Sequence, residues 1–317
     1  MTQRPSSPPA ERETWVPVET ARGLALVRAT VRQLRPNQWL KNVFCLAPLV
    51  FSKTILDLGR AERALLAFAS FSLLASAVYI FNDWKDLDKD RQHPKKRKRP
   101  MAAGLVPVPL ATALSVALLC GGLALAFLLS RPFGFVVATY LALNLGYTLR
   151  LKNVPLIDIF VIALGFVLRV LGGGYAIRVE VSPWILLCTI FLALFLGANK
   201  RRAEIAELGT DGTTRAALAG YNLHFLDHIV TALASLSILS YALYCKDPGT
   251  VRRFGPHLVF TIPVVMFGIF RYLLLVWRDG KGSSPTDVLM SDRGLQVCAL
   301  LWGASVLAVV YLHQVSD

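Results

Sequence analysis

The chain has 317 residues, of which 55% are hydrophobic, and its mean hydropathy is +0.52. That composition excludes an ordinary soluble domain and is typical of a protein with several membrane-spanning helices. The formal net charge is +14, yet no nucleic-acid-binding motif accompanies it. We therefore expect basic cytoplasmic loops and attraction to anionic membrane lipid, and no nucleic-acid partner.

The first 36 residues are predicted to form a cytoplasmic tail. Residues 1–17 are polar and proline-rich, so we expect disorder there and no signal peptide. Residues 19–36 predict an amphipathic helix with an apolar stripe and four arginines: Leu24, Val27, Val31 and Leu34, with Arg22, Arg28, Arg32 and Arg35. Such a basic helix lies on an anionic membrane surface, and the alternative is a helix that binds a soluble partner.

The rest of the chain, residues 37–317, predicts one all-α domain, a helical bundle of about nine transmembrane helices. The expected spans are 40–57, 62–84, 107–129, 133–150, 155–177, 183–200, 224–244, 256–277 and 294–313. The first is the weakest, because Pro48 and Lys53 interrupt it.

The loops between these spans alternate in charge. About 24 of the Lys and Arg residues fall on the side of the N terminus, whereas eight fall on the other side. The positive-inside rule therefore predicts a multi-pass protein of the cell (inner) membrane with a cytoplasmic N terminus. An odd number of spans puts the C terminus on the opposite side.

The stretch Phe81–Gly104 places four acidic and eight basic residues directly after an apolar run. If the helix continues, Asp83, Asp86 and Asp90 fall on one face about a turn apart, beside Asn82. Carboxylates so placed repel each other unless a cation lies among them, either a divalent metal or the basic residues that follow. Hard oxygen ligands suit Mg²⁺, which completes its shell with water and substrate phosphates. The stretch therefore predicts a cytoplasmic Mg²⁺–diphosphate site, against the alternative of a solvated loop of mixed charge.

A basic segment follows these acids. It contains Lys95, Lys96, Arg97, Lys98 and Arg99. Pro94 and Pro100 limit how far a helix runs, so a turn is expected to fold Arg97 and Arg99 back toward the acids. An arginine fork grips a phosphate in two places, which makes Lys96, Arg97 and Arg99 candidate substrate contacts.

Further charged residues lie within or at the ends of other apolar runs, where they are costly. Tyr147, Lys152 and Asp158 flank the junction of the fourth and fifth spans, and Arg169 lies inside the fifth. Arg169 must be paired or face a wet cavity, so a ligand cavity and a structural ion pair with another helix both stay open. The sixth span ends in Asn199, Lys200, Arg201 and Arg202, which are cavity-mouth residues or topology anchors.

The segment NDWKDLDKD fits the NDxxDxxxD pattern of the UbiA superfamily of intramembrane prenyltransferases. Members that prenylate aromatic rings usually carry two aspartates after the fourth span, where this chain reads YTLRLKNVPLID. That departure and the segments RQHPKKRKRPMAAG, NKRRAE and SPTDVLMSDR make the chain similar to the phosphoribosyltransferase branch of the superfamily. The likeness covers nearly everything after residue 35.

The resemblance implies Mg²⁺-dependent transfer of phosphoribose from 5-phosphoribosyl 1-diphosphate to a polyprenyl (decaprenyl) phosphate, with release of diphosphate. It implies that Asn82, Asp83, Asp86 and Asp90 hold the metal and that the three aspartates are catalytic. Candidate phosphate contacts elsewhere in the chain carry a charge or a polar tip. They are Lys41, Tyr147, Lys152, Asp158, Arg169, Lys200 and Arg201.

Two other classes of function stay open at this point. One is a prenyltransferase with an isoprenoid diphosphate donor and a small aromatic acceptor, and the other is a lipid transporter or lipid-binding protein. A transporter favours broken spans and mid-membrane polar groups, whereas here the polar groups gather at the cytoplasmic ends. The sequence leaves a homo-oligomer open.

Overall fold

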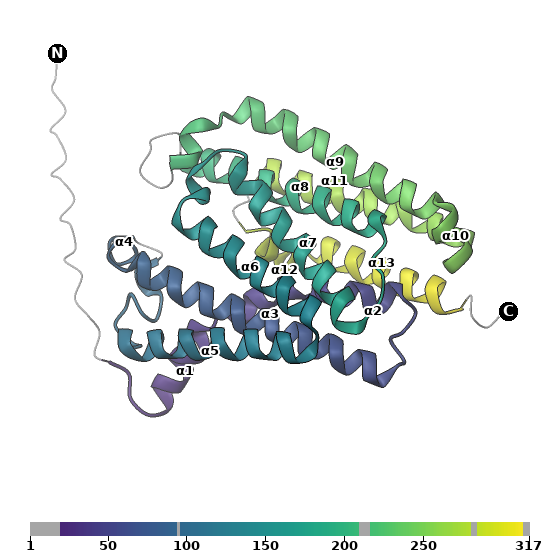
Figure 1. Cartoon of the computed structure of the whole chain (residues 1–317). Helices are drawn as coiled ribbons and strands as arrows, with labels where there is room; N and C mark the ends of the chain where they lie inside the picture. The colour runs from purple at the N-terminus through teal and green to yellow at the C-terminus, as the bar shows by residue number, and fades with distance from the viewer. Residues whose placement is uncertain (1–19, 94–95, 209–215, 280–283, 313–317) are drawn as a thin grey trace, which may run out of the picture. The chain divides into compact units, whose positions relative to one another are not determined.

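The computed structural model describes residues 20–93, 96–208, 216–279 and 284–312, and every regular element in these ranges is a helix (Figure 1). The chain divides into two compact units. Unit 1 comprises Met1–Asn37 with Ser76–Leu119, and unit 2 comprises Gln38–Ala75 with Cys120–Asp317. The expected disorder of residues 1–17 falls outside the described residues, and the domain boundary after residue 36 stays a prediction.

Eight helices in the described part of the chain are long and apolar enough to cross a membrane. They are α3 (Leu58–Lys85), α5 (Val108–Leu129), α6 (Arg131–Leu149), α7 (Ile157–Ile177), α8 (Pro183–Leu208), α9 (Leu223–Lys246), α11 (Ile262–Asp279) and α13 (Arg293–Leu312). The shorter α-helices are α1 (Leu24–Gln33), α2 (Ala47–Phe51), α4 (Leu87–Gln92), α10 (Pro248–Phe254) and α12 (Pro285–Ser291). The 3-10 helices are η1 (Pro36–Leu46), η2 (Lys96–Lys98), η3 (Leu151–Asn153), η4 (Ala216–Gly220) and η5 (Pro256–Thr261). The all-α membrane architecture is thereby confirmed.

The expected span at 40–57 takes a different form, since η1 is followed by the five-residue helix α2. Pro48 lies in the first turn of α2, where its missing N–H ends the preceding helical ladder. No single long helix forms over residues 40–57, so this segment is not among the eight candidate membrane spans of the described residues.

Unit 2 is built on helices α6, α7, α8 and α9, each packed against the next (Figure 1). Side-chain caps fix where two of them begin, because Ser130 accepts the Phe133 N–H of α6 and Asn222 accepts the Phe225 N–H of α9. Gly173 of α7 allows η1 to pass close by, since a Cβ there would lie 1.9 Å from the Cys45 carbonyl oxygen.

Unit 1 has a small apolar core that includes Ile80, Met101 and Val106. Helix α1 turns Ala29 and Gln33 into this unit and leaves an apolar stripe outside. The exposed fractions of Leu24, Val27 and Val31 are 66%, 57% and 50%. The amphipathic helix expected at 19–36 is therefore present with narrower bounds.

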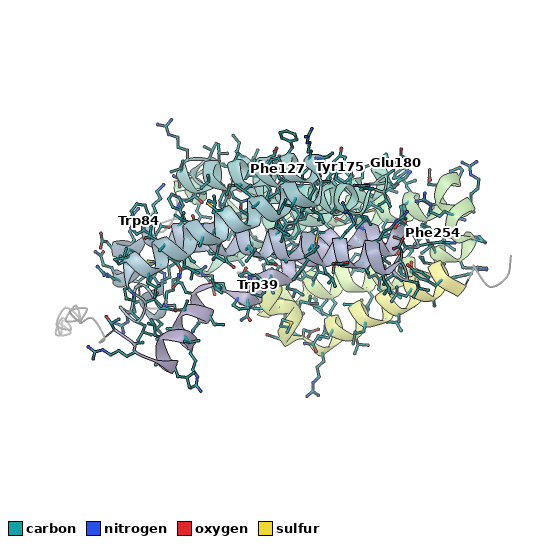
Figure 2. All side chains as sticks on the ribbon, turned by 60° about the horizontal axis from the view of Figure 1, so that its bottom comes forward. Trp39, Trp84, Phe127, Tyr175, Glu180 and Phe254 are labelled. Atoms are coloured by element: carbon teal, nitrogen blue, oxygen red, sulfur yellow. The ribbon has the colours of Figure 1, made fainter. Side chains whose placement is uncertain are left out.

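Many exposed side chains on the long helices are apolar. Phe127 at the end of α5 is 41% exposed and Tyr175 near the end of α7 is 48% exposed (Figure 2). Exposed apolar residues on helices of this length suit contact with lipid tails.

At the entry to α13, Asp292 accepts two hydrogen bonds from Arg271 and one from the Leu295 N–H.

Candidate active site

The acids of the Phe81–Gly104 stretch lie where α3 gives way to α4. Asp83 is in the last turn of α3, Asp86 is the residue before α4, and Asp90 is inside α4. The Asp86 N–H donates to the Asn82 carbonyl and the Asp90 N–H donates to the Asp86 carbonyl, at 3.0 and 2.8 Å. The helical spacing thus persists through the junction. Asp83 and Asp90 are each 2% exposed, so two carboxylates are buried in unit 1.

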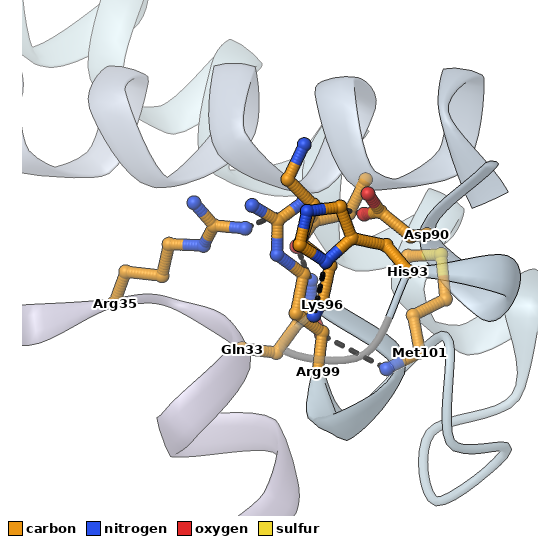
Figure 3. Close-up of polar contacts among 8 residues, drawn as sticks. Gln33, Arg35, Asp90, His93, Lys96, Arg99 and Met101 are labelled. Atoms are coloured by element: carbon orange, nitrogen blue, oxygen red, sulfur yellow. Dashed lines mark hydrogen bonds and ion pairs between the residues drawn. The ribbon is translucent and has the colours of Figure 1, made fainter. Parts of the chain in front are cut away.

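Asp83 receives hydrogen bonds from the end of α1. Gln33 Nε2 donates to Oδ2 at 2.8 Å, and Arg35 Nη2 donates to Oδ1 at 2.5 Å. Gln33 is itself held by the Met101 N–H, which donates to Gln33 Oε1 at 3.2 Å (Figure 3). Arg35 adopts a left-handed backbone with φ 55° and stacks over Tyr79, 5.0 Å from the ring centroid. Neither Gln33 nor Arg35 was predicted from the sequence to be a site residue.

Arg99 bridges the two buried carboxylates. One nitrogen, Nη1, donates to Asp83 Oδ1 at 3.0 Å and also to Asp90 Oδ2 (Figure 3). The turn expected before Pro100 exists as η2, and it does fold Arg99 back onto the acids. Two carboxylates that share one guanidinium nitrogen repel each other, and the cation between them offsets that repulsion.

The charge of this cluster balances. Asp83 and Asp90 carry two negative charges, and Arg35 and Arg99 carry two positive ones. Burial raises the pKa of the Asp90 carboxyl above its usual value, and the Arg99 guanidinium opposes that shift. We define these four residues with Gln33 as the acid–arginine cluster.

The remaining predicted residues of this stretch are placed differently. Lys96 and Arg97 are exposed in η2, Asp86 is half-buried, and Lys95 lies outside the described residues. The Lys96 N–H donates to His93 Nδ1 at 3.4 Å, and burial lowers the pKa of His93 (Figure 3). Asn82 Oδ1 is buried and accepts no hydrogen bond within the described residues.

The donor set fits a Mg²⁺ ion held by few protein ligands. No group of three or more His, Cys, Asp or Glu residues in the described ranges is placed to bind a metal. Two carboxylate oxygens nevertheless converge on one cationic nitrogen, and the orphan oxygen of Asn82 belongs to the residue beside Asp83. Mg²⁺ is usually bound through one or two carboxylates plus water and substrate phosphates, which matches this set.

A second polar network lies in unit 2 around Asp158, which is 0% exposed. Arg201 Nε donates to Asp158 Oδ2 at 2.5 Å, and the Tyr221 hydroxyl donates to Oδ1 at 2.7 Å. Arg201 also donates to Glu204 at 2.5 Å and to the Tyr147 hydroxyl at 3.2 Å. The predicted residues Tyr147, Asp158 and Arg201 thus meet in one network, and both Asp158 oxygens are engaged by neighbouring side chains.

Tyr221 was not predicted to be a site residue, because no local sequence pattern distinguishes it from other tyrosines. Its hydroxyl accepts the Leu156 N–H at 2.5 Å and donates to Asp158, so Tyr221 joins the segment before α9 to the start of α7. Burial and the hydrogen bond to Asp158 raise the pKa of Tyr221, which keeps it a neutral donor.

Arg169 lies apart from that network in unit 2 and is 7% exposed. Nε donates to Asn42 Oδ1 and Nη2 to the Tyr140 hydroxyl, each at 2.7 Å. Nη1 donates to the Gly165 carbonyl at 2.8 Å. The two alternatives open from the sequence were a ligand cavity and a structural ion pair, and the hydrogen bonds of Arg169 instead join its guanidinium to neutral oxygens.

The three predicted lysines of unit 2 take separate places. Lys41 Nζ donates to Gln38 Oε1 at 2.7 Å, and Lys200 Nζ lies 3.9 Å from Glu204 Oε1. Lys152 lies in η3 and is half-buried. Asn199, expected at a cavity mouth, is 0% exposed and donates to the Phe195 carbonyl.

Comparison with known proteins agrees with this arrangement. The model of the UbiA prenyltransferase family matches residues 44–202. The chain is 37% identical over 299 residues to a decaprenyl-phosphate phosphoribosyltransferase from Corynebacterium glutamicum, covering 90% of this chain and 88% of that one. A protein of the same name from Mycobacterium tuberculosis is also 37% identical, over 90% of this chain and 95% of that one.

The fold also matches solved structures. A UbiA homologue from Archaeoglobus fulgidus bound to DMAPP and Mg²⁺ superimposes with a TM-score of 0.68 at 20% identity, covering 88% of this chain and 98% of that one. The long apolar helices together with these matches make the chain a multi-pass membrane protein. It belongs to the UbiA prenyltransferase family.

Proposed function

We propose that the chain transfers phosphoribose from 5-phosphoribosyl 1-diphosphate to a polyprenyl phosphate and releases diphosphate. The observation that carries the proposal is the acid–arginine cluster, which sets two buried carboxylates against two arginines. A donor with three phosphoryl groups needs cations at its site beyond a metal. The likeness over nine-tenths of the chain to proteins named for this transfer narrows the choice of donor and acceptor.

Asp83 and Asp90 are the residues that would hold Mg²⁺, with Asn82 and Asp86 beside them as further oxygen donors. When bound, the ion supplies Lewis-acid stabilisation of negative charge on the diphosphate. Gln33 keeps Asp83 oriented, because it bonds Asp83 with its amide nitrogen and the Met101 N–H with its amide oxygen.

The bond from the anomeric carbon to the diphosphate oxygen breaks, and a bond from that carbon to the polyprenyl phosphate oxygen forms. The transition state is oxocarbenium-like, by analogy with glycosyl transfer. Arg35, Arg97 and Arg99 offer bidentate donors to the departing diphosphate. The acceptor oxygen is already an anion, so no strong general base is required.

The basic residues of unit 2 remain proposals as phosphate contacts. Lys152 and Lys200 are half-buried, which leaves part of each ammonium-bearing side chain accessible. Arg169 and Arg201 are almost fully buried and bonded to side chains of their own unit, which favours a supporting role.

The proposal also includes an orientation. Positive loops put the N terminus, the acid–arginine cluster and the phosphorylated donor on the cytoplasmic side of the inner membrane. The exposed stripe Leu24, Val27 and Val31 of α1 would lie in the membrane surface, with the polyprenyl tail in lipid.

The test offers purified full-length chain, in nanodiscs with Mg²⁺, one donor at a time and measures released diphosphate. Polyprenyl phosphate is present with 5-phosphoribosyl 1-diphosphate, and small aromatic acceptors are present with isoprenoid diphosphates. We expect release and a phosphoribosylated lipid only with the first pair. Release only with an isoprenoid diphosphate would overturn the proposal and identify an aromatic prenyltransferase, and no release with any donor would favour a lipid-binding protein.

A further inference from the structure

Arg99 is one of two partly exposed members of the acid–arginine cluster, and it is the one that bonds both carboxylates. The side chains of Arg99 and Arg35 are 30% and 25% exposed, whereas those of Asp83 and Asp90 are 2% and 3% exposed. Arg99 therefore reaches inward from the accessible side and closes over two buried carboxylates with one nitrogen. Its backbone is fixed on both sides, because the Arg99 N–H donates to the Lys96 carbonyl and the Ala103 N–H donates to the Arg99 carbonyl. These backbone bonds hold the loop without involving the Arg99 side chain.

Arg35 is held more firmly on the same carboxylate. Its guanidinium stacks on Tyr79 while donating to Asp83 at 2.5 Å. Gln33 fixes the other Asp83 oxygen through a bond that the Met101 backbone supports. Asp90, by contrast, accepts its side-chain hydrogen bond from Arg99. Departure of Arg99 would therefore open Asp90 to another cation, while Asp83 keeps its hydrogen bonds from Gln33 and Arg35.

The charge count gives this departure a cause. With both arginines in place the four charged groups sum to zero, so a divalent cation entering beside them meets two fixed positive charges. The same cation entering as Arg99 leaves meets two carboxylates and one arginine. A diphosphate arriving with the metal offers Arg99 a new set of anionic oxygens a short distance away.

We infer that Arg99 is a placeholder cation: it occupies the Asp83–Asp90 pair without substrate, yields that position to the metal, and transfers to the diphosphate of the donor. The inference rests on the proposed function, since it takes the acid pair to be the metal ligands. It makes Arg99 a competitor of the metal in the free protein and a partner of the donor in the complex. Metal and donor binding are thereby coupled, each strengthening the other by the same factor.

The inference predicts that one substitution, Arg99→Gln, increases the affinity for the metal. If Arg99 covers the acid pair for about nine-tenths of the time, the apparent Kd of the metal alone is about tenfold weaker than the intrinsic one. Arg99→Gln removes the competitor, so metal alone should bind roughly tenfold more tightly while diphosphate binds more weakly. A residue that merely stabilises the fold, or merely contacts phosphate, gives no gain in metal affinity.

The experiment titrates Mn²⁺ into purified full-length chain and measures free Mn²⁺ by electron paramagnetic resonance, with and without inorganic diphosphate. Arg99→Gln should tighten Mn²⁺ binding without diphosphate and reduce the enhancement that diphosphate gives. Arg99→Lys keeps a cation and should retain weak binding. Lys98→Gln is the matched control, because Lys98 is exposed in the adjacent η2 turn and its loss tests net charge alone.

Each outcome decides something. Equal or weaker Mn²⁺ binding in Arg99→Gln, in protein whose thermal unfolding matches that of the parent, would overturn the inference while leaving the metal site in place. An equal gain in Lys98→Gln would assign the effect to overall charge and also overturn it. If the parent chain binds no Mn²⁺ even with diphosphate, the proposed metal site itself is wrong.

Discussion

The buried pair of Asp158 and Arg201 gives the sharpest stability prediction. Arg201 is 1% exposed and Asp158 is 0% exposed, so Arg201→Met leaves a buried carboxylate that still accepts a hydrogen bond from Tyr221 but has lost its cation. Breaking a buried pair by removing one partner costs about 3–5 kcal/mol, or roughly two to four orders of magnitude in the unfolding equilibrium.

The neighbouring substitutions set a scale for that cost. Tyr221→Phe keeps the ion pair but loses the hydrogen bond to a charged oxygen, worth about 1.5–3 kcal/mol, and the acceptor of the Leu156 N–H. The Lys200 side chain is 37% exposed, and its Nζ lies 3.9 Å from Glu204. Lys200→Met removes this partly exposed pair, which is worth about 0–1 kcal/mol. The expected order of destabilisation is therefore Arg201→Met, then Tyr221→Phe, then Lys200→Met.

The assay is unfolding of the purified chain in mixed micelles as the denaturing detergent fraction rises, followed by circular dichroism. Arg201→Lys is the charge-conserving control, and it should recover part of the loss since an ammonium still faces Asp158. The reasoning is refuted if the free energy of unfolding of Arg201→Met lies within about 1 kcal/mol of the parent value. It is also refuted if Arg201→Met unfolds at the same detergent fraction as Lys200→Met.

The remaining predictions concern the metal, the sidedness and the pH dependence. Asp83→Asn should abolish turnover, and it should also lower stability because Arg35 and Arg99 lose a buried charged partner, so turnover is compared per folded protein. Chelation by EDTA should abolish turnover reversibly; full activity in EDTA would contradict a Mg²⁺ requirement. A cysteine at Gln92, exposed at the end of α4, should react with an impermeant maleimide only after the membrane is opened, and labelling in intact cells would invert the topology. The hydrogen bonds from Arg271 hold the pKa of the Asp292 carboxyl below its usual value, so Asp292 stabilises the fold above about pH 4 and loses that effect as the pH falls through its depressed pKa. Asp292→Asn should therefore lower the unfolding midpoint at pH 7 and much less at about pH 3, and an equal loss at both would point to a neutral capping effect.

Periodic and apolar features of the chain were predictable from the sequence alone. Eight apolar runs became helices with bounds close to those expected, because burial in lipid leaves a backbone no alternative to helical hydrogen bonds. The turn that returns Arg99 to the acids was also predictable, since the prolines around it limit the helix. The segment after Pro36 was harder, because hydropathy does not distinguish a 3-10 helix from an α-helix.

Pairings between distant residues were not predictable. Gln33 and Arg35 meet Asp83 across about fifty positions, and Tyr221 meets Asp158 across 63. The local sequence around a polar residue does not predict which distant residue it will bond. The sequence therefore selected Asp158 and Arg201 separately as phosphate contacts, while the fold joins them to each other.

Helix α1 carries a practical consequence for handling the purified protein. Its outer stripe of Leu24, Val27 and Val31 is exposed, and four residues past Ala29 on its inner face Gln33 holds the Asp83 carboxylate. We expect solubilisation to act on the outer stripe first, since α1 is short and has few buried residues. A micelle that covers the long spans but not this stripe should leave the chain helical while loosening Gln33 from Asp83. Secondary-structure content is therefore a poor criterion for choosing an extraction detergent, and retained turnover is the better one.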